Sequence, residues 1–301
     1  MFSCKSVRTM SPKWTFAQEM LRGENQMAML GKAVRMSRLV NPKSDKMMAI
    51  TVDHSISRGI MTGLIHIQDT IDKIVAGAPN AITMTKGIAE QCFHQHAGKV
   101  SLLLKCSSYS PVAPTCDTVF GDVEEGIRMG ADGVSVGAMV LGNYQDQQFA
   151  EIGKLAKDCM SYGIPLVGHI YPKGETVAPE DRTKWENIAY GVRAGAELGV
   201  DIIKTTYTGD PKTMAKVVEA CPARVAIQGG DACKTIEDYM NMTYDAINKA
   251  NVGGVVFGRF VWSYSDVTSL VKALGSIIHD KATPQQAMEM LRDLESDNKK
   301  K

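Results

Sequence analysis

Lys204 stands where an amine could act as a nucleophile, because it ends the apolar run 199–203. An amine that emerges from a buried strand loses hydration, which disfavours its charged form and lowers its pKa. A neutral amine can attack a ketone or an aldehyde and form a Schiff base. Lys204 is therefore a candidate nucleophile, although a lysine that extends to solvent or pairs with a carboxylate would show the same pattern.

Other residues could assist such chemistry. Lys86 and Lys105 also follow apolar runs, and spacing does not choose among the three lysines. Either cation would lower the pKa of Lys204 further if it lay close to it. Asp53 and Tyr171 could move protons on and off a substrate hydroxyl. Asp53 could equally be a turn residue or a helix N-cap, and Tyr171 a packing aromatic residue.

Glycines follow two further apolar runs. Gly229 and Gly230 come after one of them, and Gly258 precedes Arg259 after the other. Backbone N–H groups can approach an anion closely at glycine, and a guanidinium group binds phosphate through two parallel hydrogen bonds. Tight turns would explain either glycine site alone, but together they predict a phosphate-binding site.

The histidines do not indicate a metal site. His54 and His169 also follow apolar runs, but no HExxH motif or carboxylate cluster accompanies them. We therefore expect both to be hydrogen-bonded structural residues. His94 and His96 fall in an expected helix, where residues two positions apart do not share a face. We expect neither a metal ion nor another cofactor.

The elements that must position these residues form a regular series. Short apolar runs alternate with segments of helical spacing, and most runs begin about 30 residues apart, which is typical of parallel strands in a (β/α)8 barrel. An open, doubly wound sheet is the alternative. In a barrel, the polar residues that end the strands meet at one face, where active sites lie. The expected strands are 47–52, 81–85, 100–106, 133–136, 165–169, 201–205, 224–228 and 254–257.

Helical periodicity places helices at 145–162, 183–198 and 283–294. We expect one barrel domain over residues 46–282. The N-terminal extension, 1–45, is too long for a barrel turn and is expected to form a capping helix or an oligomer contact. Residues 283–301 are expected to form a C-terminal helix with a frayed tail.

Composition excludes several classes of protein. The 301 residues are 44% hydrophobic and 22% charged, which is typical of globular proteins and not of disordered chains or coiled coils. Because 34 Lys and Arg residues face 33 Asp and Glu residues, no basic excess indicates a nucleic-acid or membrane partner. The sequence shows no signal-peptide or membrane-spanning pattern, and its seven cysteines form no CxxC pair. We expect a cytoplasmic protein without disulfides.

Longer motifs around these residues resemble the class I, Schiff-base aldolases of the archaeal-type fructose-bisphosphate aldolase group. That group also includes 2-amino-3,7-dideoxy-D-threo-hept-6-ulosonate synthase and the autoinducer-2 thiolase. The resemblance runs from about Gly31 to about Ala287 and is most specific around Lys204. The motifs are LGKAVRMSRLVNP (30–42), VDHSISRG (52–59), YPKGE (171–175), DIIKTTYTGDPKT (201–213), AIQGGD (226–231) and VVFGRFVW (255–262).

The resemblance implies a role for each site residue. Lys204 would form the Schiff base, Tyr171 would be the general acid/base, and Asp53 would assist proton transfer. Lys105 corresponds to a second lysine of the fructose-bisphosphate aldolases. The family needs no metal, and its members commonly assemble as homo-oligomers, often decamers. The phosphate-binding positions would be Gly229, Gly230, Gly258 and Arg259, with His54 beside the substrate.

Three departures from the family pattern bear on the choice of substrate. Asp231 stands next to the expected phosphate, Ser55 replaces a usual glycine, and His169 stands where a tryptophan is common. The motifs at 30–42 and 195–210 lie nearer the heptulosonate synthase pattern, whereas Tyr171 argues against the thiolase.

We therefore expect a class I aldolase that cleaves or forms a C–C bond beside the carbonyl of a phosphorylated ketose such as fructose 1,6-bisphosphate. One alternative is a transaldolase-type synthase of the heptulosonate kind. The others are a thiolase that acts on a phosphorylated dione with coenzyme A, and a non-catalytic sugar-phosphate-binding barrel.

Overall fold

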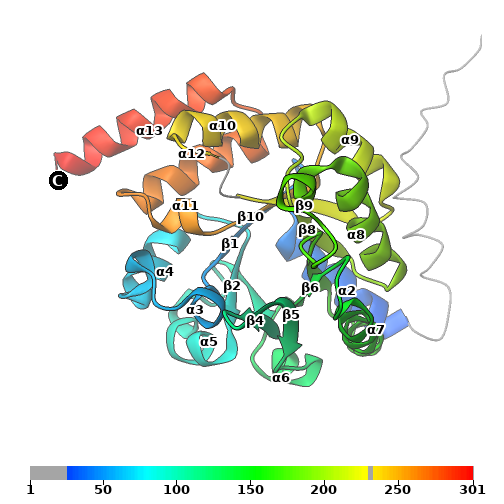
Figure 1. Cartoon of the computed structure of the whole chain (residues 1–301). Helices are drawn as coiled ribbons and strands as arrows, with labels where there is room; N and C mark the ends of the chain where they lie inside the picture. Colours follow the sequence, from blue (N-terminus) through cyan, green and yellow to red (C-terminus); the bar gives the residue numbers. More distant parts are fainter. Residues whose placement is uncertain (1–25, 230–232, 301) are drawn as a thin grey trace, which may run out of the picture.

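The strands form a closed barrel (Figure 1). The computed structural model describes residues 26–229 and 233–300. Within these ranges, eight parallel strands pair in the order β1-β10-β9-β8-β7-β6-β3-β2, and β2 returns to β1. All eight expected strands are confirmed, and the open sheet is excluded. The barrel strands are β1 (Met47–Thr51), β2 (Ala81–Thr85), β3 (Ser101–Lys105), β6 (Gly133–Met139), β7 (Leu166–Tyr171), β8 (Ile202–Thr205), β9 (Arg224–Gln228) and β10 (Gly254–Phe257).

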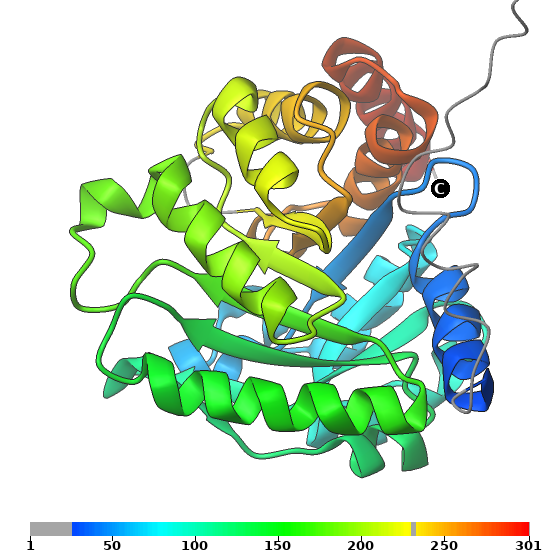
Figure 2. The same cartoon turned by 90° about the vertical axis from the view of Figure 1, so that its right-hand side faces the viewer.

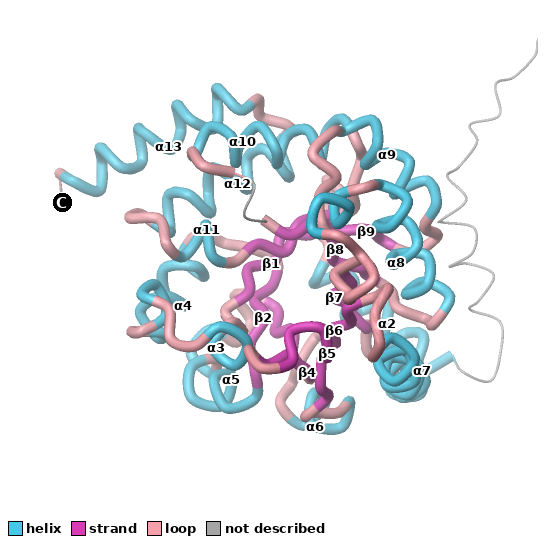
Figure 3. The backbone as a smooth tube through the Cα atoms, in the orientation of Figure 1, coloured by secondary structure: helices cyan, strands magenta, loops and turns pink. Residues whose placement is uncertain are grey.

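Helices cover the outside of the strands (Figure 3). The expected helix 145–162 is confirmed; it buries Ile152, Leu155 and Cys159 and ends at Gly163, which has a left-handed φ of 62°. The helix expected at 183–198 begins at Trp185, because residues 179–183 form a separate 3-10 turn. The main outer helices are α4 (Ile67–Ala76), α5 (Lys86–Cys92), α6 (Val123–Arg128), α7 (Gln145–Tyr162), α8 (Trp185–Glu197), α9 (Pro211–Ala220), α10 (Ile236–Tyr244) and α12 (Val267–Asp280).

The barrel interior changes from apolar to polar along the strand direction. One cluster of buried side chains packs inside the barrel and includes Leu103, Val167 and Ile202. Because side chains alternate along a strand, the residue two positions further on also points inward. Those positions are Lys105, His169 and Lys204, and they begin a polar layer at the carboxyl ends of the strands. The alternation therefore places the candidate residues above an apolar floor.

Helix α2 (Gln26–Leu39) closes the opposite end of the barrel, where the strands begin (Figure 2). Leu39 and Val40 belong to the apolar cluster inside the barrel. Lys32 forms an ion pair of 2.8 Å with Asp201, which lies just before β8, and Arg35 donates to the Gly163 carbonyl at 2.9 Å. The described part of the N-terminal extension is thus the expected capping helix, while residues 1–25 lie beyond the described ranges.

A β-hairpin interrupts the connection between β3 and α6. It consists of β4 (Ser107–Ser110) and β5 (Ala113–Val119), which pair antiparallel to each other. The Ser107 hydroxyl accepts a hydrogen bond of 2.7 Å from the Gly137 N–H on β6. On β5, the Asp117 N–H donates to the Gln148 side chain of α7 at 3.1 Å. These contacts hold the hairpin on β6 and α7. The sequence pattern did not lead us to expect the hairpin.

The C-terminal helix is longer than expected. Helix α13 (Pro284–Lys299) continues beyond Leu294 through residues that we expected to fray. The Tyr264 hydroxyl donates to Glu295 at 2.8 Å, and the Asn298 amide donates to Asp266 at 2.9 Å. These side-chain hydrogen bonds hold the last turns against the N-terminus of α12, so the expectation of a frayed tail was wrong for residues 296–299.

The described cysteines are all free thiols, four of them buried. Burial raises the pKa of the Cys106 thiol to about 12 and that of Cys233 to about 11, which makes both unreactive at neutral pH. No helix in residues 26–229 or 233–300 has the length and apolar character needed to cross a membrane.

Replacing Leu39 by alanine should lower the free energy of unfolding by about 2–5 kcal/mol, because the substitution leaves a cavity at the end of the barrel that α2 covers. Leu39 is fully buried, whereas Leu30 on the same helix is 61% exposed. Leu30→Ala is therefore the matched control and should change stability little. Urea unfolding followed by circular dichroism measures both, and equal effects would contradict the capping role.

Candidate active site

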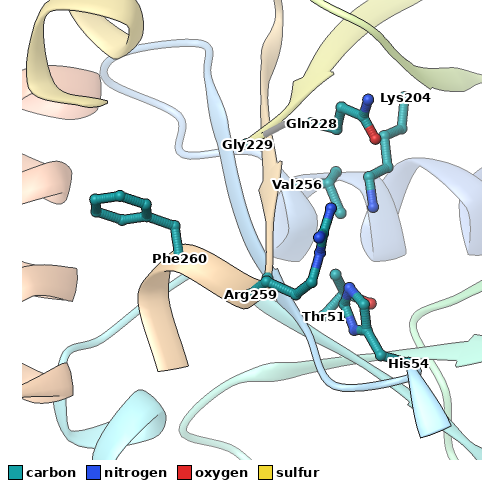
Figure 4. A pocket seen from close by; sticks show the side chains of 9 residues that line it. Thr51, His54, Lys204, Gln228, Gly229, Val256, Arg259 and Phe260 are labelled. Atoms are coloured by element: carbon teal, nitrogen blue, oxygen red, sulfur yellow. The ribbon is translucent and has the colours of Figure 1, made fainter. Parts of the chain in front are cut away.

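The polar layer opens into a pocket at the carboxyl ends of β1, β8, β9 and β10. Lys204 and Arg259 point toward each other across this pocket, and His54 lies below them in the view of Figure 4. Five of the residues singled out from the sequence are thus brought together. The pocket is lined by Thr51, His54, Lys204, Gln228, Gly229, Val256, Gly258, Arg259 and Phe260.

Lys204 has the properties of a nucleophilic amine. Its side chain lies near the end of β8 and the residue is only 6% exposed. Burial lowers its pKa from the ordinary value to about 8; the Asp53 carboxylate opposes this shift, whereas the Lys105, Lys173 and Arg259 cations add to it. At neutral pH a useful fraction of the amine is therefore unprotonated and able to attack a carbonyl carbon.

Of the two other candidate lysines, Lys105 and Lys86, only Lys105 acts on the charge of Lys204. Lys105 is buried at the end of β3, where its amine donates to the Ser107 hydroxyl at 3.1 Å. Its charge is one cause of the lowered pKa of Lys204, as the sequence suggested for a nearby cation. Lys86 instead lies beyond the end of β2 and forms an ion pair of 2.7 Å with Glu125. That ion pair holds Lys86 away from the pocket and raises its pKa.

Asp53 supplies a carboxylate beside the candidate nucleophile. Its side chain is 11% exposed, and it accepts a hydrogen bond from the Thr51 hydroxyl. Burial acts to raise its pKa, but the neighbouring His54 ring, the Lys204 and Lys105 cations and the hydrogen bond from Thr51 outweigh burial, so the pKa lies below the ordinary value. Asp53 is therefore ionised at neutral pH and stabilises positive charge on Lys204.

Tyr171 ends β7 and is a proton donor at neutral pH. The residue is 8% exposed, and the Lys173 amine lies 4.9 Å from the centre of its ring. Burial raises the pKa of its hydroxyl well above 10, and the negative charges of Asp53 and Asp117 add to this shift. The phenol thus holds its proton until another group takes it.

The two histidines are uncharged at neutral pH, because the pKa of each lies below its ordinary value. Burial lowers the pKa of His54 to about 4, and its Nδ1 atom has no hydrogen-bond partner among the described residues. Burial and the Lys204 and Lys105 cations hold the pKa of His169 well below its ordinary value. The Nε2 atom of His169 is also unpartnered within the described ranges. His169 pairs in register with Lys204, so it belongs to the polar layer and not to the structural core.

The expected phosphate positions lie together, apart from Gly230, which belongs to the undescribed segment 230–232 along with Asp231. Gly258 has to be glycine, because a Cβ there would lie 2.6 Å from the His54 ring. Arg259 begins helix α11 (Arg259–Trp262), and the Trp262 indole N–H holds this helix by donating to the Thr51 carbonyl at 3.2 Å. Gly229 follows β9 and leaves room for the Tyr239 hydroxyl.

His94 and His96 lie in different environments. His96 is buried and its Nε2 lies 2.9 Å from an Asp72 carboxylate oxygen, while His94 is exposed. No group of three His, Cys, Asp or Glu side chains suited to a metal occurs among the described residues.

The sequence analysis missed Thr51, Val256 and Phe260 of the pocket lining, and it also missed Asp117, whose charge acts on Tyr171. Asp117 reaches the barrel mouth from the β4–β5 hairpin and is 8% exposed. Its negative charge acts on the Tyr171 hydroxyl. An alternating segment around a Ser-Pro-Val-Ala-Pro turn was the available signal for the hairpin, but the segment does not reveal that Asp117 returns to the strand ends.

Comparison with known proteins identifies a consistent group. The sequence model described as DeoC/LacD family aldolase matches residues 47–264. The 2-amino-3,7-dideoxy-D-threo-hept-6-ulosonate synthase of Halobacterium salinarum is 30% identical over 86% of this chain and 95% of its own. The 2-amino-4,5-dihydroxy-6-oxo-7-(phosphonooxy)heptanoate synthase of Streptomyces griseus is 26% identical over 85% of this chain and 93% of its own.

Solved structures agree with these relatives. An archaeal fructose 1,6-bisphosphate aldolase superposes with a TM-score of 0.73 at 26% identity, covering 83% of this chain and 99% of its own. An archaeal fructose-1,6-bisphosphate aldolase, also at 26% identity and a TM-score of 0.73, has its catalytic Lys covalently bound to the carbinolamine intermediate of the substrate; the match covers 82% of this chain and 99% of that one.

The surroundings of Lys204 predict the pH dependence of its reactivity. Competitive acetylation with acetic anhydride, mapped by mass spectrometry, should show a midpoint near pH 8, the pKa of this amine. Lys105→Met should raise the midpoint because it removes a neighbouring positive charge, and Asp53→Asn should lower it because it removes a negative one. A midpoint near 10.5, or shifts of the same sign in both variants, would contradict this assignment.

Proposed function

The chain belongs to the DeoC/LacD family of aldolases, and from this premise we propose that it is a class I aldolase in which Lys204 forms a Schiff base with a phosphorylated ketose such as fructose 1,6-bisphosphate. The observation that carries this proposal is the buried Lys204 amine with a pKa of about 8, which faces a pocket with Arg259 on its other side.

The phosphate of the ketose binds over β9 and β10. Arg259 offers a fixed positive charge there, and Gly229 and Gly258 let the backbone approach an anion. Gly230, the residue after Gly229, is the fourth phosphate-binding position that we propose. Binding energy from the phosphate holds the carbonyl carbon beside Lys204, so that attack no longer requires a chance encounter.

The C–C bond of the substrate breaks after Lys204 has formed an imine with the ketone. The neutral Lys204 amine adds to the ketone to give a carbinolamine, and loss of its hydroxyl as water gives a positively charged iminium. The iminium draws electrons from the neighbouring C–C bond, which leaves an enamine on Lys204 and releases the aldehyde half. The lysine supplies the electron sink itself, so the chemistry requires no metal.

Tyr171 transfers protons during these steps, and Asp53 stabilises the positive charge that forms. The Tyr171 phenol donates its proton to the departing carbinolamine hydroxyl and becomes a phenolate. The phenolate then accepts the proton of the substrate hydroxyl whose C–O group becomes the aldehyde, which restores the phenol. The ionised Asp53 stabilises the iminium, since its charge already favours the positively charged form of Lys204. The high pKa of Tyr171 makes its phenolate a strong base at that moment.

A transaldolase-type synthase is the second candidate function. It would use the same Lys204 enamine but add it to an amino-acid-derived aldehyde. The 30% identity to the archaeal heptulosonate synthase, over 95% of that protein, supports this candidate. Tyr171 supplies a phenol in the site, which argues against the thiolase alternative.

The proposal also includes assembly as a homo-oligomer, such as a decamer, in the cytoplasm. Exposed Ile56, Ile60 and Ile65 lie within one short connection between β1 and α4 and provide apolar surface for contact between copies. The free thiols of the described residues are compatible with a reducing compartment.

Borohydride should trap fructose 1,6-bisphosphate or dihydroxyacetone phosphate on Lys204, because reduction converts the imine into a stable secondary amine. The measurement is a mass increase on the intact protein followed by peptide mapping. Activity should persist in EDTA. Lys204→Met should abolish the adduct, whereas Lys86→Met, which alters a lysine outside the pocket, should leave it intact. An adduct on Lys105 alone would sink the assignment.

Tyr171→Phe should separate imine formation from bond cleavage. The variant retains Lys204 and should still be labelled slowly, but kcat for cleavage should fall by about 10²–10⁴-fold because the proton carrier is lost. Steady-state cleavage rates and borohydride labelling of the same preparation provide the two measurements. Unchanged cleavage would remove Tyr171 from the mechanism while leaving Lys204 in place.

A further inference from the structure

Asp117 occupies an unusual place at the barrel mouth. The hairpin carries it over the inner face of β6, where its carboxylate fills the space that a side chain at position 137 would occupy. Any Cβ at Gly137 would collide with the Asp117 carboxylate. The Asp117 backbone is held by Gln148, which accepts from its N–H at 3.1 Å. The carboxylate is thus fixed at the level of His169, which pairs in register with Gly137.

One oxygen of this buried carboxylate has no hydrogen bond within residues 26–229 and 233–300. The residue is 8% exposed, and its Oδ1 atom is buried with no hydrogen-bond partner among the described residues. A buried carboxylate oxygen without a hydrogen bond costs free energy that a bound donor would recover. A donor on a substrate that reached this oxygen would therefore be favoured.

The barrel order places Asp117 on the aldehyde side of the reaction. Around the closed ring, β6 lies four strands from β10, directly across the mouth from Gly258 and Arg259. Strands β8 and β7, which carry Lys204 and Tyr171, lie between them. A substrate with its phosphate over β10 and its carbonyl carbon at Lys204 would extend its other half toward β6.

The β6 side of the barrel mouth carries one negative and one positive side chain, Asp117 and Arg58. The Tyr171 hydroxyl experiences both the negative charge of Asp117 and the positive charge of Arg58. Arg58 is exposed at the end of α3 (Ser55–Arg58), which packs against β4 of the hairpin. A carboxylate with an unmet oxygen and a nearby guanidinium are the complements of an ammonium and a carboxylate. A phosphate placed against Asp117 would be repelled.

This inference rests on the Lys204 chemistry of the proposed function in its transaldolase-type form, not on fructose 1,6-bisphosphate as the substrate. We propose that Asp117 is a specificity-determining residue that binds an ammonium group on the aldehyde half of the substrate. The ammonium would donate to the unpartnered Oδ1 oxygen and form a charge-assisted hydrogen bond. Asp117 thereby favours an amino-acid-derived aldehyde over one that carries a phosphate at this position.

Condensation assays with paired aldehydes test this role. Dihydroxyacetone phosphate or fructose 1,6-bisphosphate, whichever borohydride traps on Lys204, serves as the donor. Aspartate 4-semialdehyde and succinate semialdehyde serve as acceptors, because they share a carbon skeleton and differ in the ammonium group. Glyceraldehyde 3-phosphate is the phosphorylated acceptor. The wild-type protein should have a kcat/KM for the amino aldehyde about 10- to 100-fold above that for its amino-free partner.

Asp117→Asn should bring that ratio close to one by lowering kcat/KM for aspartate 4-semialdehyde alone. Gly137→Ala provides an independent variant, since it retains the carboxylate but displaces it, and it should reduce the same preference. Asp146→Asn, an exposed acid of α7, is the matched control and should leave the ratio unchanged. Borohydride labelling of Lys204 by the donor should be equal in all four proteins, which shows that each variant is folded.

The outcomes are distinct. Equal losses for both semialdehydes, no preference in the wild-type protein, or preference for glyceraldehyde 3-phosphate would overturn the role of Asp117 while leaving Lys204 chemistry intact. Failure of every aldehyde to react with a trapped donor would also count against it. Absence of any donor adduct on Lys204 would instead refute the proposed function itself.

Discussion

The site depends on the loss of hydration at Lys204. Inside the barrel, a floor of apolar side chains that includes Ile202 and Val167 separates the polar layer from the opposite end, and Leu39 of α2 packs into that floor. Because water cannot approach from below, the ammonium form of Lys204 is disfavoured, and burial is the largest cause of its lowered pKa. Neighbouring charges then adjust this shift in both directions without removing it.

The remaining residues follow from that buried amine. A charged iminium in a poorly hydrated place needs a counter-charge, and Asp53 is ionised there because the surrounding cations outweigh the effect of its own burial. A neutral His169 beside Lys204 adds no further repulsion. The polar layer thus contains a limited number of charges that compensate one another, consistent with a chain whose formal net charge is only +1.

The sequence predicted the barrel and most of the pocket because both depend on local patterns. Strands buried on both faces are continuous apolar runs, and the polar residues that end them must meet at one face. Strand alternation explains why Lys105 reaches the interior while Lys86 does not: Lys105 lies two positions after the inward Leu103, whereas Lys86 is the first residue of α5. The position of Asp117 was not predicted because it depends on contacts with Gly137 and Gln148, which lie 20 or more positions later in the sequence. The last turns of α13 were not predicted because they depend on hydrogen bonds to Tyr264 and Asp266, about 30 positions earlier.

The β4–β5 hairpin leaves the barrel after β3 and returns before α6, while β3 and β6 pair directly beneath it. Closure of the barrel therefore does not require the hairpin strands. If acceptor choice resides at Asp117, the hairpin is a separable module: its length and sequence can diverge between relatives while the strand that carries Lys204 stays constant. Changes confined to the β4–β5 hairpin could then give new substrate preferences, while the residues that break the C–C bond stay the same.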